Sequence, residues 1–202
     1  MIVKICGIQS VEAGQMAVDA GADMIGFVFA NSRRKVSPEQ ASGIGKELPA
    51  QVKKVGVFVN EPIESLLDIA ETAGLDYIQL HGDETPDYIK SISKPVIKAF
   101  SVASENDLKQ LADYECEYYL LDSPAEAYRG GNGTAFDWSL ANSEIIPREK
   151  LFLAGGLHSG NVQQAIEEVS PVGVDVSSGV ETDRKKDPIK IKQFITAAKR
   201  GQ

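Results

Sequence analysis

The sequence predicts an α/β protein built as a closed (β/α)8 barrel, a TIM barrel, with one domain over residues 1–202. Short runs rich in β-branched residues alternate with longer amphipathic segments, which indicates parallel strands joined by crossover helices. Strand starts recur at intervals of roughly 24 residues, and eight such units nearly fill the chain. An open doubly wound sheet uses the same alternation, but neither a GxGxxG stretch after the first run nor a P-loop is present. Eight units therefore favour a closed barrel.

Eight segments are expected to be strands, because each is short, apolar and bounded by turn residues. In chain order they are residues 2–6, 24–29, 54–59, 77–80, 96–100, 118–121, 151–153 and 172–176.

The segments between these strands have helical patterns. The first helix is expected to begin at Ser10 and to end near Gly21, since serine caps helix N-termini and glycine ends helices. The second begins at Ser37, with Pro38 at the first helical position. Further helices are expected over 63–74, 85–92, 104–112, 161–169 and 188–199, and a less regular pattern covers 138–146. The longest connection, 123–138, contains Gly130, Gly131 and Gly133 and is typical of a mobile functional loop.

The composition excludes several classes of protein. A chain of 202 residues with 43% hydrophobic and 25% charged residues is an ordinary globular domain. Its formal charge of -8 argues against general binding of nucleic acid or anionic membranes, which needs clustered Lys and Arg. We therefore expect neither partner.

The N-terminus and the cysteines bear on location. The first residues, MIVKICGIQS, lack the basic flank and long apolar core of a signal peptide, and no apolar stretch could span a bilayer. The two cysteines, Cys6 and Cys116, fall at opposite ends of their strands and therefore lie beyond disulfide reach. We expect a cytoplasmic protein with free thiols, in which Cys116 is structural.

Polar and glycine residues gather where the predicted strands end, which is the face where barrels of this kind place their active sites. Alternate side chains of a strand face opposite sides, so assigning the apolar neighbours to the helix layer selects the interior residues. The residues selected are Lys4, Cys6, Gln79, His81, Lys98, Leu120, Asp122, Asp175 and Ser177. A thiol and a carboxylate at the barrel mouth, Cys6 and Asp122, suggest an acid–base pair.

Each of these residues also has a purely structural interpretation. Taken alone, Cys6 is more easily explained as a small core hydrophobe than as a catalyst. Lys4, Lys98 and Asp175 could form a buried charge cluster, and burying a lysine is expensive unless it is paired. His81 alone could be a hydrogen-bonded core histidine.

Glycines after the last two strands indicate a phosphate site. Gly155 and Gly156 follow the seventh strand, and Ser178 and Gly179 follow the eighth. Loops at these positions often bind phosphate through backbone N–H groups, and glycine allows the close approach. Turns need glycine in any case, but glycines in both adjacent loops favour phosphate.

The chain resembles the phosphoribosylanthranilate isomerase family of tryptophan biosynthesis. The matching segments run in order over essentially the whole chain: KICGI, GADMIGFVF, SRRKVSPEQA, VGVFVN, IQLHGDE, IKAF, LLDS, GGNGTAFDW, LAGGL and VDVSSGVE. The resemblance implies an Amadori rearrangement of N-(5-phosphoribosyl)anthranilate to 1-(2-carboxyphenylamino)-1-deoxyribulose 5-phosphate. It implies no cofactor and no metal.

The same resemblance assigns roles to individual residues. Asp122 is expected to be the general acid that opens the ribose ring, and Cys6 the general base that removes the C2′ proton. Nearby cations, Lys4 and the loop arginines, are expected to raise the thiolate fraction of Cys6. The substrate-binding residues implied are His81 and Asp175, Arg34 for the anthranilate carboxylate, and Gly155, Gly156, Ser178 and Gly179 for the phosphate.

Three departures from the family pattern concern loops. The family usually shows Ser-Lys-Arg followed by an aromatic residue, whereas Ser32 is followed here by Arg33, Arg34 and Lys35. Arg33 is therefore an alternative to Arg34. The frequent proline before the serine is missing, and a usual Pro-Gly is replaced by Asp183-Arg184, which should change loop stiffness more than chemistry.

Other functions remain as alternatives. Indole-glycerol-phosphate synthase would call for a catalytic lysine at a strand end, and a pentose-phosphate epimerase for metal-binding histidines, of which this chain has only His81 and His158. A non-catalytic protein that binds a phosphorylated ligand is a third reading, against which the Cys6 and Asp122 pair argues. The expected partner is a small phosphorylated substrate, and we expect a monomer, with a homodimer as the alternative.

Overall fold

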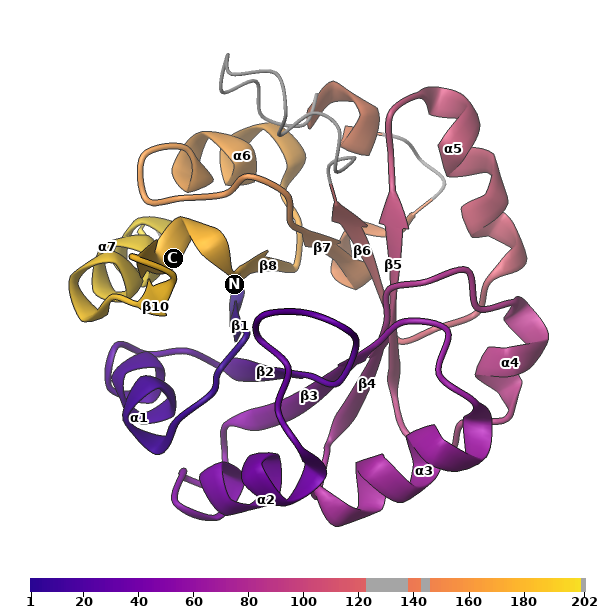
Figure 1. Ribbon diagram of the computed structural model, residues 1–202. Helices are drawn as coiled ribbons and strands as arrows, with labels where there is room; N and C mark the ends of the chain where they lie inside the picture. The colour runs from indigo at the N-terminus through magenta and orange to yellow at the C-terminus, as the bar shows by residue number, and fades with distance from the viewer. Residues whose placement is uncertain (123–137, 143–145, 201–202) are drawn as a thin grey trace.

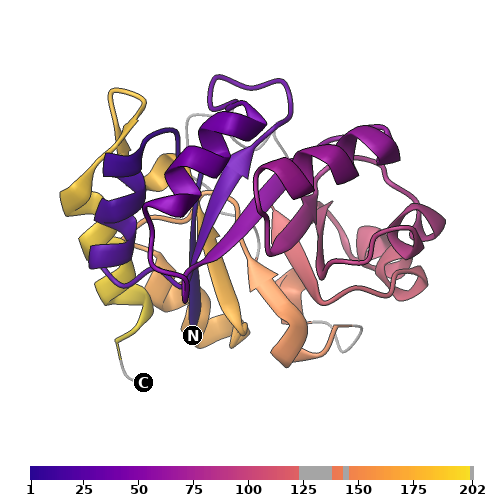
Figure 2. The same cartoon turned by 90° about the horizontal axis from the view of Figure 1, so that it is seen from below.

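The computed structural model describes residues 1–122, 138–142 and 146–200. Within this part of the chain, eight parallel strands close into a barrel in the order of the sequence. They are β1 (Ile2–Cys6), β2 (Met24–Val28), β3 (Lys53–Phe58), β4 (Tyr77–Leu80), β5 (Val96–Ser101), β6 (Tyr118–Asp122), β7 (Leu151–Leu153) and β8 (Gly173–Val176). Figure 1 shows the helices as a ring around these strands, and Figure 2 shows the barrel turned by 90°. The predicted closed barrel is confirmed, and all eight strands begin and end within one residue of the predicted bounds.

Helices follow the strands and cover the outside of the barrel. The α-helices are α1 (Val11–Asp19), α2 (Pro38–Lys46), α3 (Ile63–Thr72), α4 (Pro86–Lys90), α5 (Glu105–Lys109), α6 (Val162–Val169) and α7 (Pro188–Ala198). Short 3-10 helices are η1 (Gln110–Asp113), η2 (Trp138–Asn142), η3 (Arg148–Lys150) and η4 (Ser178–Val180). Of the described helices, none is long and apolar enough to cross a membrane.

The predicted helix starts are confirmed by side-chain caps. Ser10 accepts a hydrogen bond from the N–H of Ala13, and Ser37 accepts one from the N–H of Gln40, which satisfies donors that have no partner inside the helix. At the end of α1 the cap is Ala20, and Gly21 follows it with a φ of 99°, where a side chain would be strained.

Some predicted elements differ from the structure. The predicted helix over 104–112 is divided into α5 and η1, and only η2 occupies the described part of the irregular stretch 138–146. A two-stranded hairpin, β9 (Glu181–Thr182) and β10 (Lys185–Lys186), was not expected. The glycine-rich loop that contains Gly130, Gly131 and Gly133 lies outside the described residues.

The barrel wall separates two hydrophobic clusters. The small interior cluster consists of Met24, Val55, Ile97, Ala99, Leu120, Phe152 and Ala154. The larger cluster lies between the strands and the helices and includes Val3, Ile5 and Leu121. The interior cluster fills the barrel below the polar residues of the mouth, so that the chemistry of the site is confined to one end.

The predicted direction of Lys98 is wrong. Its neighbours Ile97 and Ala99 belong to the interior cluster, so Lys98 points outward to the helix layer. There its Nζ lies 3.1 Å from Glu84 Oε2, and both side chains are buried. The run from Val96 to Phe100 is apolar on both faces, so parity alone could not decide, and Glu84 supplies the partner on the outer side.

Candidate active site

Cys6 and Lys4 point into the barrel from β1, as predicted, and meet Asp175 on the neighbouring strand β8. Lys4 pairs in register with Asp175, and its Nζ donates to Asp175 Oδ1 over 3.0 Å. Gly26 on β2 leaves the space that this group needs, since a Cβ there would lie 2.8 Å from Cys6 Sγ and 3.2 Å from Lys4 Nζ. The thiol and the ammonium group are therefore close neighbours in a buried site.

Burial dominates the acidity of the thiol. It raises the pKa of Cys6, while Lys4 and Lys186 act in the opposite direction and Asp175 adds to the increase. Burial also opposes the charge of Lys4, but Asp175 and Cys6 outweigh it, so the pKa of Lys4 is raised. Of the expected cations only Lys4 acts on the thiol; the second, Lys186, was not expected, and no loop arginine contributes. The two lysines only reduce the effect of burial. The pKa of the thiol therefore stays above its ordinary value despite the two neighbouring ammonium groups.

His81 and Asp122 form the second polar group, on strands β4 and β6. His81 Nε2 lies 3.3 Å from Asp122 Oδ2, and about a third of each side chain is exposed, at 33% and 28%. The other ring nitrogen of His81, Nδ1, lies 3.1 Å from the amide nitrogen of Gln79. The predicted interior positions of all three residues are confirmed.

A cavity of about 400 Å³ opens at the C-terminal ends of β4 to β8. Its lining comprises His81, Ser101, Asp122, Ala154, Gly155, Gly156, Leu157, Asp175, Val176, Ser177, Ser178 and Gly179. Seven of the nine predicted site residues belong to it. Cys6 and Arg34 lie outside this lining, but Cys6 is joined to it because Ser177 Oγ donates to the backbone oxygen of Cys6 over 3.1 Å.

The two glycine loops present backbone donors to this cavity. Gly155 and Gly156 have φ values of 76° and 64°, and in the described part of the chain their N–H groups have no hydrogen-bond acceptor. Gly179 packs so closely on the neighbouring loop that a Cβ would lie 1.9 Å from the backbone oxygen of Leu157. The loops after β7 and β8 are thus held backbone to backbone, which only glycine permits.

Both candidate arginines of the loop after β2 bind one buried carboxylate, Glu181. Arg34 binds it with two donors, Nε at 2.7 Å and Nη2 at 3.0 Å, and Arg33 Nη2 lies at 2.7 Å. Arg34 is the more buried of the two and lies over Gly7, where a Cβ would be 2.5 Å from Arg34 Cδ. Arg34 therefore lies beside the residue that follows Cys6.

Glu181 and Lys186 were missed by the sequence reasoning. Lys186 Nζ donates to Glu181 Oε1 over 2.9 Å and to the backbone oxygen of Ser177, also over 2.9 Å. Burial favours the neutral form of Glu181, but Arg34, Lys186 and Arg33 lower its pKa to about 2. No strand parity applies to this short hairpin, so the only available signal was that the segment VDVSSGVE ends in this glutamate.

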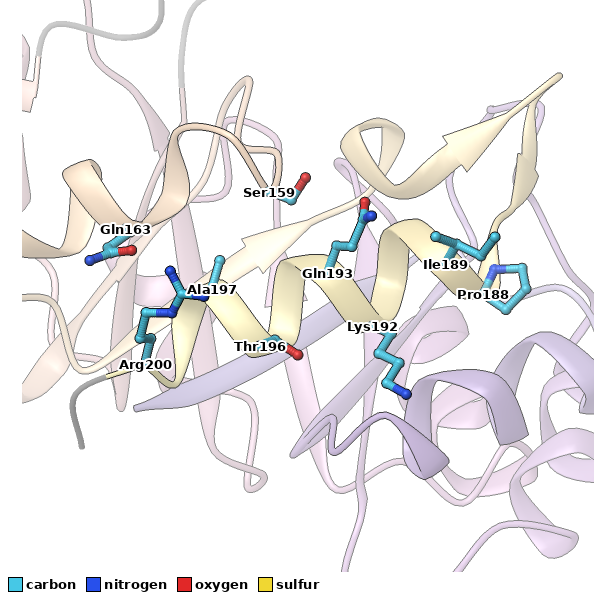
Figure 3. A pocket seen from close by; sticks show the side chains of 9 residues that line it. All are labelled: Ser159, Gln163, Pro188, Ile189, Lys192, Gln193, Thr196, Ala197 and Arg200. Atoms are coloured by element: carbon cyan, nitrogen blue, oxygen red, sulfur yellow. The ribbon is translucent and has the colours of Figure 1, made fainter.

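A larger hollow, about 830 Å³, lies on the outer face beside α7 and the start of α6 (Figure 3). Its lining residues include no carboxylate, thiol or imidazole. The smaller cavity at the barrel mouth is lined by His81, Asp122 and Asp175 and adjoins Cys6, and it is therefore the candidate active site. Among the residues that the structure describes, no group of three or more His, Cys, Asp or Glu is placed to hold a metal ion.

Comparisons with known proteins agree on one family. Residues 3–197 match the family model for N-(5'phosphoribosyl)anthranilate (PRA) isomerase. An N-(5'-phosphoribosyl)anthranilate isomerase of Oceanobacillus iheyensis is 52% identical over 201 residues, which cover 99% of this chain and 98% of the relative. One from Bacillus cereus is 50% identical over 200 residues, 98% of each chain.

Solved structures give the same picture. Phosphoribosyl anthranilate isomerase from Thermotoga maritima has a TM-score of 0.91 and 45% identity, and the match covers 98% of this chain and 99% of that one. A structure of such an isomerase in complex with reduced 1-(o-carboxyphenylamino)-1-deoxyribulose 5-phosphate has a TM-score of 0.87 and 43% identity, with the same coverage.

Proposed function

Because the chain belongs to the N-(5'-phosphoribosyl)anthranilate isomerase family, we propose that the cavity at its barrel mouth carries the acid–base chemistry of that isomerisation. The protein is an isomerase of tryptophan biosynthesis that acts on N-(5'-phosphoribosyl)anthranilate. The observation that supports these site roles best is the gathering of two carboxylates, backbone donors without an acceptor among the described residues, and an adjoining thiol at one end of the barrel.

Asp122 acts as the general acid. Its proton goes to the ring oxygen of the ribose, the C1′–O bond breaks, and the nitrogen lone pair forms a C=N bond to C1′. The side chain is suited to this role because it faces the cavity and His81 lies on its Oδ2.

Cys6 acts as the general base on the open-chain intermediate. The thiolate takes the C2′ proton, the C–H electrons form a C1′=C2′ double bond, and the former C=N electrons return to nitrogen. The resulting enolamine becomes the ketone when C1′ gains a proton and the C2′ hydroxyl loses one. Lys4 supports the step because its positive charge beside Sγ stabilises the thiolate.

The remaining residues bind the substrate. Arg34 holds the anthranilate carboxylate through Nη1, since Glu181 already occupies its Nε and Nη2, and the more exposed Arg33 is the alternative. Gly155, Gly156, Ser178 and Gly179 hold the phosphate through backbone N–H groups. His81 and Asp175 border the ribose from opposite strands, β4 and β8.

We propose that the protein acts as a monomer in the cytoplasm. All assigned residues come from one chain, so we propose an active monomer; a Thermotoga maritima relative is described as dimeric, and sedimentation of the purified protein distinguishes the two. The free thiols of Cys6 and Cys116 fit a reducing compartment, the cytoplasm.

A fluorescence assay that follows loss of N-(5'-phosphoribosyl)anthranilate without added metal tests the roles. We expect Cys6→Ala and Asp122→Asn each to lower kcat by about 100-fold or more, because each removes one proton-transfer group. Binding of reduced 1-(o-carboxyphenylamino)-1-deoxyribulose 5-phosphate should change little.

Two variants serve as matched controls. Cys116→Ala removes the other thiol, and Asp113→Asn removes an exposed carboxylate that precedes β6 at the opposite end. Both should keep wild-type kcat. Near-normal turnover in Cys6→Ala and Asp122→Asn would disprove the assignment of base and acid.

A further inference from the structure

Gln79 is an amide placed inside the barrel on β4, where its side chain is almost completely buried. Its neighbour in register on β5 is Ile97, a member of the interior hydrophobic cluster. The amide nitrogen of Gln79 lies 3.1 Å from Nδ1 of His81. Its Oε1 has no hydrogen-bond partner in the described part of the chain.

This arrangement is unfavourable for stability. A buried carbonyl oxygen without a donor loses the hydrogen bonds that water gives it in the unfolded chain. A leucine would fill a similar volume without that loss. The contact that the amide does make, to the ring of His81, is therefore the feature that distinguishes it from an apolar residue.

The direction of that contact determines where the imidazole carries its proton. An amide NH2 group can only donate, so Nδ1 must accept with its lone pair and the ring proton must lie on Nε2. Nε2 faces the carboxylate of Asp122 at 3.3 Å. In the other tautomer, a lone pair on Nε2 would face Asp122 Oδ2, and the two would repel each other whenever Asp122 is in its ionised form.

We propose that Gln79 is a positioning residue that fixes His81 in its Nε2–H tautomer and thereby orients Asp122. Gln79 precedes His81 by two residues on the same face of the chain and does not line the cavity. It acts through His81, without touching the substrate. The effect on turnover rests on the proposed role of Asp122 as the acid, whereas the tautomer of His81 does not depend on it.

Nitrogen-15 NMR of the imidazole rings tests the tautomer directly. The chain has two histidines, so the resonances absent in a His81→Asn variant identify those of His81. We expect the neutral ring of the unliganded wild type to show a pyridine-type Nδ1 and a pyrrole-type Nε2. A pyrrole-type Nδ1 in the wild type would overturn the proposal, whatever the variants do.

Two substitutions of Gln79 separate position from packing. Gln79→Leu removes the donor, and we expect averaged tautomers and a kcat lower by about tenfold with KM little changed. Gln79→Glu has nearly the same shape but presents only acceptors when ionised. It should draw the ring proton to Nδ1, reverse the two types of resonance and lower kcat by more than Gln79→Leu does.

Ile97→Val is the matched control, because it alters packing beside Gln79 without touching the imidazole. It should lower the melting temperature slightly and keep the wild-type tautomer and kcat. If Gln79→Leu and Gln79→Glu keep the wild-type resonances, or if Ile97→Val loses as much kcat as they do, the proposal is wrong. Failure of the acid role itself would appear separately, as normal turnover in Asp122→Asn.

Discussion

At the scale of single residues, the site depends on a position that has no side chain. Gly26 on β2 faces the interior, and the volume that a methyl group would take is already occupied by Cys6 Sγ and Lys4 Nζ. Neither atom can withdraw easily, since Lys4 is held by Asp175 and Cys6 is fixed on a buried strand. The position of the Cys6 thiol is therefore set by three adjacent strands together.

Substitution of Gly26 should affect chemistry more than binding. In Gly26→Ala the new Cβ would lie 3.1 Å from the Cα of Cys6 as well as close to Sγ, so the thiol must shift. We expect kcat to fall by about tenfold with little change in KM, because displacing a catalytic group mainly affects the transition state.

Gly43→Ala on the exposed side of α2 is the matched control, with nothing within 4 Å of the added Cβ. It should keep full activity and gain up to about 1 kcal/mol of stability, since alanine favours helix. Steady-state kinetics and thermal unfolding of both variants provide the measurement. Wild-type kcat in Gly26→Ala would mean that the position of the thiol is not critical.

Residue parity predicted the interior correctly wherever one face of a strand was clearly apolar. In β1 the apolar Val3 and Ile5 left Lys4 and Cys6 for the interior, and the structure agrees. It failed for Lys98, whose strand is apolar on both faces. Parity could not identify Glu181 as a site residue, because Arg34 is distant from this carboxylate in sequence and meets it and Lys186 only in the folded chain.

At the scale of elements, the hairpin of β9 and β10 links the two sides of the site. It carries Glu181 and Lys186, and it connects the arginines after β2 to Ser177 in the loop after β8. Its turn residues, Asp183 and Arg184, both have positive φ values of 49° and 65°. This is the position where the family pattern has Pro-Gly. Strand patterns predicted all eight barrel strands, but a hairpin of two-residue strands has no periodicity to detect.

The charge of Glu181 should make stability depend on pH. Its pKa in the folded protein is about 2, against an ordinary value of 4.5. A lowered carboxyl pKa stabilises the folded state above the ordinary value, and this contribution is lost as the pH falls through 2. Ionisation of Glu181 contributes at most about 3 kcal/mol to the free energy of unfolding. Burial lowers the pKa of Lys186 by more than the attraction of Glu181 raises it. The net contribution of the whole cluster to the free energy of unfolding is therefore smaller.

Urea unfolding at several pH values between about 6 and about 2, a range that spans both pKa values, measures this contribution. Glu181→Gln should be less stable than the wild type at the upper end, and the difference should shrink as the pH falls. The exposed Glu117→Gln should follow the wild-type curve throughout. A difference between Glu181→Gln and wild type that stays constant over the whole range would contradict the ion-pair account.

At the scale of the whole molecule, the two ends of the barrel differ in function. The loops after the strands carry the site, whereas the loops before them carry none of the assigned residues. The end of α7 lies near the start of β1 in both views (Figures 1 and 2), and Lys199 Nζ donates to the backbone oxygen of Gly21. We therefore expect that the two ends can be joined and the chain opened in a loop before a strand without disturbing the site.

A circular permutant tests this division. Joining the ends by a short flexible linker and opening the chain between the exposed Ala50 and Gln51, in a loop before β3, should leave kcat and KM within about twofold of wild type. Opening it between Asn31 and Ser32 instead cuts the loop that carries Arg34, and KM should rise at least about tenfold. Equal activity of the two permutants would argue against a functional difference between the ends.

The seven-residue apolar cluster inside the barrel has a consequence for traffic through the enzyme. It plugs the cylinder from below, so a ligand has no exit toward the N-terminal ends of the strands. A ligand that enters through the barrel mouth must therefore also leave through it. We therefore expect product to be a competitive inhibitor, which raises the apparent KM and leaves kcat unchanged.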